Sequence, residues 1–181
     1  MFLRTTHTVL ITLSILLLQN NRLQAQKDAV EKEKLTNKEI VSRMNDLFNR
    51  NKPDSAMLFY NDTLQHAGNI NGKSFLLAMH DDILATFPDV QTKILDMWEE
   101  GGWVIARCQF TGTHLGTASL PHHGGLLTGL APTKKSFSVQ HIRMYKLEKG
   151  KITARQAIRD DLAMYQQLGI VPTPPAFRPA K

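Results

Sequence analysis

The chain has 181 residues, with 22 Lys and Arg against 16 Asp and Glu, and this length suits one domain with a hydrophobic core. The excess of positive charge is dispersed and forms no basic patch interleaved with aromatic residues, which argues against binding of nucleic acid. The single cysteine, Cys108, excludes an internal disulfide, and its place in an apolar alternation favours a buried, inert thiol.

The first 26 residues differ from the rest of the chain. A short segment carrying Arg4 precedes the apolar run TVLITLSILLL, and Ala25 stands where a signal peptidase would cleave. This pattern predicts a secretory signal peptide over residues 1–26, and hence a secreted or periplasmic protein, with an uncleaved N-terminal anchor as the alternative. The remaining chain has 20 basic and 16 acidic residues, a net charge of +4. Residues 27–35 are charged and are predicted to form a flexible tether.

Helical patterns come next along the chain. Residues 36–39, TNKE, have the spacing of a capping box, and apolar residues then recur at helical spacing over 40–48. Pro53 ends this predicted helix and begins a short second one. Residues 62–73, DTLQHAGNINGK, are predicted to be a turn-rich passage. Residues 74–87 are predicted to form another amphipathic helix.

Alternating, strand-like patterns dominate the second half. The predicted strands cover residues 90–100, 103–114, 135–148 and 151–159, with a long Gly/Pro/His loop over 115–133 and a helix over 162–169. Helices followed by a hairpin-rich sheet predict an α+β domain over residues 36–170, with helices covering one face of a mostly antiparallel sheet. Residues 171–181 contain four prolines and are predicted to be an irregular tail.

Two adjacent aspartates stand at the junction between the last predicted strand and the final helix. Strand alternation puts Ile152, Ala154, Gln156, Ile158 and Asp160 on one side, which is mostly apolar. If the strand stays regular, Asp160 points inward, and Asp161 points outward as the helix cap. A carboxylate that faces a semi-apolar pocket can exchange a proton near neutral pH. The alternative is that both aspartates only begin the helix.

The strand over 135–148 places polar groups among apolar ones. His141 and Arg143 lie between Val139 and Tyr145 on one side of this strand, which favours polar groups that point into a pocket. The alternative is that this side is solvated and that Ile142 and Met144 face the core.

Motifs for metal or covalent chemistry are missing from the sequence. It has no HExxH, no Cys/His cluster, no GxSxG, and no glycine-rich phosphate loop. We therefore expect no metal site and no cofactor.

Five blocks of sequence together resemble a known family. They are TFPDV (86–90), GGWVIARCQFTGTHLG (101–116), APTKKSFSV (131–139), YKLEKGKI (145–152) and AIRDDLAMYQQLG (157–169). In this order, and over about residues 40–170, they resemble the SnoaL-like polyketide cyclases, often labelled ester cyclases. The resemblance implies the nuclear transport factor 2-like fold, a curved sheet wrapped around helices that forms a cone with one apolar pocket.

The resemblance also implies roles for single residues. In these cyclases an aspartate near the end of the last strand is the acid/base for an intramolecular aldol closure, and it maps onto Asp160. His66 maps onto a histidine at the pocket wall. The chain departs from the family where many relatives have a tryptophan preceded by a histidine, because Gln156 and Arg155 stand there. Arg143 stands where a histidine is common.

Two functional hypotheses follow. In the first, the chain is an exported, cofactor-free enzyme that acts on a small apolar carbonyl or ester compound. Asp160 would be the acid/base, with Asp161 as its rival, and His66, His141, Arg143 and Gln156 would position the substrate or stabilise an oxyanion. In the second, the same pocket binds a small apolar ligand without catalysis. The resemblance also implies a homodimer.

Overall fold

A computed structural model describes residue 19, residues 35–121 and residues 125–173. The chain divides into two compact units, Met1–Leu35 and Thr36–Lys181, and the second contains the fold described below. The predicted signal peptide apart from residue 19, most of the tether and most of the proline-rich tail lie outside the described residues. Export therefore stays a prediction, which the mass of the mature chain can test. Among the helices of the described residues, none is long and apolar enough to cross a membrane.

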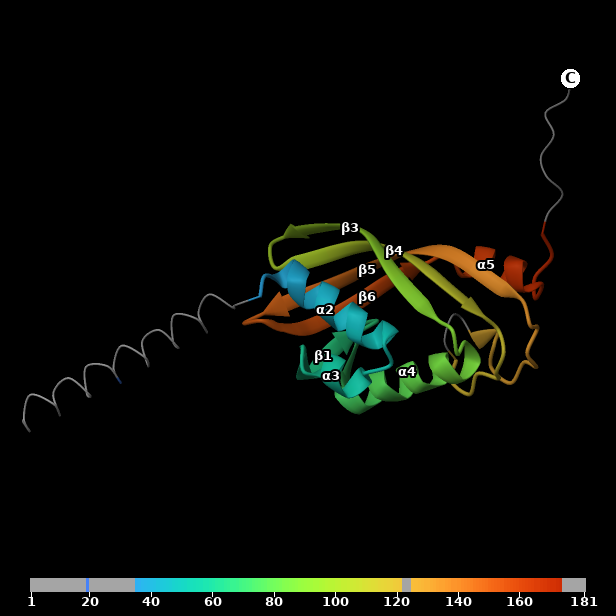
Figure 1. Cartoon of the computed structure of the whole chain (residues 1–181), viewed down its shortest axis with the longest axis horizontal. Coiled ribbons are helices and arrows are strands. Elements are labelled where there is room, and N and C mark those ends of the chain that lie inside the picture. The colour runs from blue at the N-terminus through green and yellow to red at the C-terminus, as the bar shows by residue number, and fades with distance from the viewer. Residues whose placement is uncertain (1–18, 20–34, 122–124, 174–181) are drawn as a thin grey trace, which may run out of the picture. The chain divides into compact units, whose positions relative to one another are not determined.

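Three helices lie in the first half of the domain, close to their predicted places, and two strands separate the third helix from the first two. Helix α2 (Asn37–Asn49) starts with the expected capping box: the Glu39 amide donates to Thr36 Oγ1 at 3.3 Å, and the Thr36 amide donates to Glu39 Oε2 at 2.8 Å. Helix α3 (Pro53–Met57) begins at the proline, whose fixed φ suits a first helical turn. Helix α4 (Lys73–Thr86) follows, and Figure 1 shows all three on one side of the sheet.

The sheet is curved, open and mixed, with strand order β2-β1-β6-β5-β4-β3. Its strands are β1 (Tyr60–His66), β2 (Asn69–Gly72), β3 (Gln91–Glu100), β4 (Trp103–Thr113), β5 (Ser136–Glu148) and β6 (Lys151–Arg159). Only the β1–β6 pair is parallel, and the other four pairs are antiparallel. Helix α5 (Asp161–Leu168) ends at Gly169, whose φ of 74° is the left-handed cap that glycine favours. The α+β fold predicted from the sequence is therefore confirmed.

The hairpin formed by β1 and β2 occupies the passage that the sequence predicts to be rich in turns. The sequence did not predict the two strands on either side of the turn. A tight turn with positive φ at Ala67 and Gly68 joins the two strands. Leu64 is the one fully buried side chain over residues 61–70, so the hairpin lacks the apolar alternation from which strands are recognised.

A register shift in the last strand decides which side chains face the helices. Lys146 of β5 pairs with Ala154, and Leu147 pairs with Ile152, so Thr153 is an extra residue without a partner on β5. A bulge of this kind turns every later side chain to the opposite face. As a result Ile152 and Arg155, which differ in parity, both lie on the inner face, opposite the inward-facing Leu147 and Tyr145.

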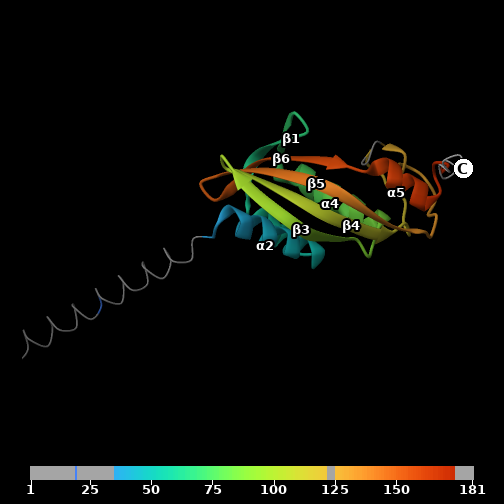
Figure 2. The ribbon, with the colours of Figure 1, turned by 90° about the horizontal axis from the view of Figure 1, so that it is seen from above.

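The two faces of the sheet differ in what covers them. A hydrophobic cluster fills the end of the inner face near α5 and consists of Phe87, Phe110, Ala118, Leu127, Phe137, Val139, Met164, Tyr165 and Leu168. Helices α2 and α4 cover the rest of the inner face. Figure 2 looks onto the outer face of β3 to β6, and no helix lies over the middle of these strands. An open space that could hold a ligand therefore has to be sought on the inner face.

Candidate functional site

Two adjacent cavities lie between the sheet and α4. The larger has a volume of about 420 Å³ and the smaller about 80 Å³. Five residues line both: Met79 and Ile83 from α4, Phe110 from β4, Arg143 from β5 and Arg155 from β6. The larger volume is within the range of small-molecule sites.

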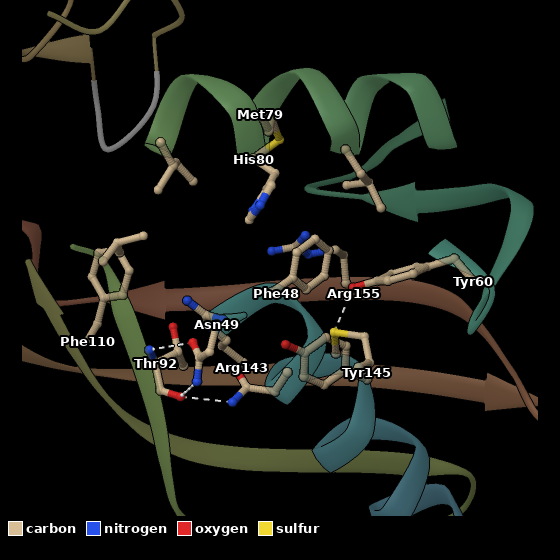
Figure 3. A pocket seen from close by; sticks show the side chains of 15 residues that line it. Phe48, Asn49, Tyr60, Met79, His80, Thr92, Phe110, Arg143, Tyr145 and Arg155 are labelled. Atoms are coloured by element: carbon tan, nitrogen blue, oxygen red, sulfur yellow. Dashed lines mark hydrogen bonds between the residues drawn. The ribbon is translucent and has the colours of Figure 1, made fainter. Parts of the chain in front are cut away.

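The smaller cavity places polar groups at the bottom of an apolar space (Figure 3). Burial raises the pKa of Tyr60 well above its usual range, so its phenol stays protonated, and its hydroxyl lies 3.6 Å from the sulfur of Met44. His80 points from α4 into this space and lies against Phe48 with ring centroids 4.8 Å apart. Burial lowers the pKa of His80, which keeps its imidazole neutral near pH 7.

Helix α2 is fixed over this cavity by two asparagines. The side-chain amides of Asn45 and Asn49 both donate to the carbonyl oxygen of Thr92, at 2.8 Å and 2.9 Å. In return the Thr92 amide donates to Asn49 Oδ1 at 2.9 Å. Because these bonds satisfy the backbone of β3 beside the cavity, they hold the helix and the strand at a fixed distance.

The larger cavity combines apolar walls with cationic groups. Its apolar part includes Phe75, Leu120 and Pro121, while His66, His141, Arg143, Arg155 and Arg159 supply the titratable side chains. Burial, followed by the charges of Arg155 and Arg159, lowers the pKa of His66 to about 4. His66 is therefore neutral at pH 7, and the arginines carry the charge of this cavity.

The predicted pocket residues His66, His141 and Arg143 meet in this larger cavity. His141 is 2% exposed and stacks on Phe110 with ring centroids 4.8 Å apart. The guanidinium of Arg143 lies 5.7 Å from the centre of the same ring. Of the two alternatives for this strand, the structure has His141 and Arg143 on the inner face.

Asp160 is not among the residues that line either cavity. Its side chain is exposed, and Oδ1 accepts a hydrogen bond from the Ala163 amide at 3.1 Å, so Asp160 is the N-cap of α5. The prediction that alternation turns Asp160 inward and leaves Asp161 as the cap is wrong, because the bulge at Thr153 reverses the faces and β6 ends at Arg159. Asp161 lies in the first turn of α5 and pairs with Arg159 at 3.2 Å. The role of Asp160 as an acid/base stays a prediction.

The same reversal places Gln156 and Arg155 on the faces opposite to those that the sequence predicts. Gln156 is exposed and lies opposite Met144 on the outer face, away from the cavities. Arg155, which alternation from Ile152 puts on the solvated side, lines both cavities. The signal that could have found Arg155 is its place in the family pattern, where a histidine is common.

Asp82 is a buried carboxylate that sequence reasoning missed. It is 7% exposed and accepts hydrogen bonds from the Ser119 hydroxyl, from the Ser119 amide at 2.7 Å and from the Leu120 amide at 3.3 Å. These bonds attach the loop that supplies Leu120 and Pro121 to the end of α4. Asp82 therefore positions one wall of the larger cavity.

Across the described residues, no three His, Cys, Asp or Glu side chains are grouped so that they could hold a metal ion. The expectation of a cofactor-free site stays a prediction.

Comparison with known proteins gives consistent matches. The family model described as "SnoaL-like polyketide cyclase" matches residues 38–168. The aklanonic acid methyl ester cyclases of Streptomyces peucetius and Streptomyces sp. strain C5 are each 28% identical over 149 residues, which cover 78% of this chain and 97% and 87% of theirs.

Solved structures resemble the chain as well. A SnoaL-like polyketide cyclase from Agrobacterium tumefaciens has a TM-score of 0.62 at 21% identity, with 75% of this chain and 99% of that chain covered. TsrD from Streptomyces laurentii has a TM-score of 0.64 at 20% identity, with 76% and 99% covered. At these identities the structures show a shared fold.

Proposed function

The chain belongs to the SnoaL-like polyketide cyclase family, and from this premise we propose that it is a cofactor-free enzyme that closes a ring within a small, largely apolar carbonyl or ester compound. The observation that carries the proposal is the cavity of about 420 Å³, in which polar groups from β1, β2, β5 and β6 face the apolar side chains of α4. The two cyclases that resemble the chain suggest aklanonic acid methyl ester as the first compound to test.

The proposed chemistry is an intramolecular aldol closure. A carboxylate, proposed to be Asp160, takes a proton from the carbon next to a carbonyl group, and the resulting enolate carbon attacks a second carbonyl group. The alkoxide formed in this step receives the proton back, so the product is an isomer of the substrate. Arg143 and Arg155 supply positive charge beside the developing oxyanions.

A second candidate is a protein that binds a small molecule without catalysis. One observation favours it: the carboxylate of Asp160 is exposed and caps α5. The cavity remains a binding site in this case, and the variants of Asp160 described in the Discussion separate the two candidates.

Filling the cavity tests both candidates at once. Ala157 lines the larger cavity on β6, and Ala157→Leu adds three carbon atoms between the arginines. We expect this variant to lower turnover of aklanonic acid methyl ester, or affinity for it where there is no turnover, by at least about tenfold, because the added volume occupies the ligand's place. Turnover appears in chromatography as a new peak of unchanged mass.

The matched control is Thr111→Leu. Thr111 lies on the outer side of β4, where it alternates with the inward-facing Phe110 and Gly112, so the same residue is introduced in the same sheet without entering the cavity. Equal losses in both variants would contradict a ligand site at Ala157.

The outer face supports a homodimer. Trp98, Ile105 and Met144 lie opposite one another on β3, β4 and β5, and Ile142 and Ile158 form a second pair beside them. Trp98 is 54% exposed and Ile158 66%. Such an apolar patch on one face is typical of a protein interface.

Trp98→Lys is therefore expected to shift the protein from dimer to monomer in sedimentation velocity. The Kd of the dimer should be weakened by roughly 100-fold, because the lysine would be buried near the same lysine of the second subunit. Leu58→Lys is the control, because Leu58 is 66% exposed but lies next to α3, away from this face. A wild-type protein that sediments as a monomer at micromolar concentration would contradict the proposal.

A further inference from the structure

We propose that the natural ligand carries a carboxylate group and that Arg143 and Arg155 bind this group inside the larger cavity. The inference rests on the proposed function, because it names the class of compound that occupies the same cavity. It goes beyond that function because an apolar carbonyl or ester compound need not carry a charge.

The arginines are arranged around one small residue. Arg155 and Arg159 flank Ala157 at two positions to either side on β6, and Arg143 lies directly opposite Ala157 on β5. All of these residues line the larger cavity. Arg143 and Arg155 are diagonal neighbours across two strands, a separation of roughly 7–8 Å between backbones. Their guanidinium groups can therefore both reach one carboxylate placed above Ala157.

The charges of these arginines are compensated unequally. Arg159 pairs with Asp161 at 3.2 Å. Arg143 and Arg155, by contrast, form no ion pair with a carboxylate of the described residues, and no Asp or Glu is among the described residues that line either cavity. Two guanidinium groups against apolar walls lose hydration without gaining a counter-ion, which is unfavourable. An anionic ligand would supply the counter-ion.

A neighbouring aromatic ring positions one of the two arginines. Arg143 lies over the face of Phe110 at 5.7 Å. Arg155 lines the smaller cavity together with Tyr60 and Tyr145. In Figure 3 both arginines are labelled in the space between the strands and α4. Guanidinium groups fixed by such contacts bind a carboxylate with little further loss of side-chain freedom.

A carboxylate fits this site better than a phosphate. The same wall contains the apolar side chains of Phe75, Met79 and Leu120, and its His66 is neutral near pH 7. A carboxylate has two oxygens, which two guanidinium groups satisfy, while its apolar body contacts the remaining wall. A phosphate has more oxygens and more charge than the guanidinium groups of Arg143 and Arg155 can satisfy, and Arg159 already pairs with Asp161.

The test compares matched probes on the complete protein. 1-Naphthoate and its neutral methyl ester share one apolar body and differ in the charge, and their affinities can be measured by calorimetry. We expect naphthoate to bind at least roughly tenfold more tightly than the ester, the factor typical of a charged hydrogen bond. Arg143→Gln and Arg155→Gln should each remove about that factor for naphthoate and change the affinity of the ester by less than about twofold.

Arg107→Gln is the matched control. Arg107 lies on the outer side of β4 and pairs with Asp96, so the same change of charge should leave the binding of both probes unaltered.

Each result decides the proposal. Equal affinities for naphthoate and its ester on the unaltered protein would overturn it and leave the proposed function standing, and this comparison needs no variant that might fail to fold. Tighter binding of 1-naphthyl phosphate than of naphthoate would overturn the carboxylate as the ligand group. Binding of none of the three probes would overturn the proposed function together with this inference.

Discussion

Asp160→Asn is expected to lower turnover by about 10²–10⁴-fold while the free energy of unfolding changes by less than about 0.5 kcal/mol. Asparagine caps a helix about as well as aspartate, so the hydrogen bond from the Ala163 amide is kept. The amide cannot take up a proton, so only an acid/base role would be lost. Initial rates on aklanonic acid methyl ester and urea unfolding measure the two quantities.

Two further variants separate the capping role from the catalytic role. Asp160→Ala removes the cap as well and is expected to cost about 1 kcal/mol of stability. Asp161→Asn breaks the ion pair with Arg159, which is partly exposed, and should cost less than about 1 kcal/mol and little activity. If Asp160→Asn keeps full turnover and Asp160→Ala loses only stability, then Asp160 is a cap alone and some other group is the acid/base.

Gly116→Ala is expected to destabilise the protein by about 3 kcal/mol or more. A Cβ at this position would overlap the carbonyl oxygen of Ala85 and lie 2.8 Å from its carbonyl carbon. Both are backbone atoms near the end of α4, and backbone atoms cannot rotate away from a clash as the end of a flexible side chain can. The amides of Leu115 and Gly116 also donate to the Thr86 oxygen at 3.1 Å and 3.0 Å, which fixes the loop against the helix.

Gly72→Ala provides the control for this variant. A Cβ at Gly72 would meet its nearest neighbour, Ser74 Oγ, at 3.7 Å, and Gly72 has an extended backbone with φ of −86°. Its expected cost is about 0.5–1 kcal/mol, because alanine is a poorer N-cap residue than glycine. Urea unfolding of both variants provides the comparison, and equal stabilities would contradict the close approach at Gly116. A loosened loop would also displace Leu120, which lines the larger cavity.

Local patterns predicted most of the secondary structure. The capping box at Thr36 and Glu39 marked the start of α2, and the alternation from Trp103 and from Ser136 marked β4 and β5. These signals depend on neighbours within one segment, so they can be read without knowing the partners of that segment. The hairpin of β1 and β2 was missed because few of its side chains are buried.

For the candidate site too, some features could be predicted from the sequence and others depend on the tertiary structure. The sequence by itself determined that His141 and Arg143 share one side of a strand and that an aspartate pair begins the last helix. Only the tertiary structure decided that Arg155 lies in the cavity, that Gln156 and Asp160 are exposed, and that Asp82 holds the loop of Ser119. For Asp82 the physical reason is a contact between segments 37 residues apart in the sequence. For the residues of β6 it is the unpaired Thr153: a bulge is set by hydrogen bonds to the neighbouring strands, and one extra residue reverses every face that follows it.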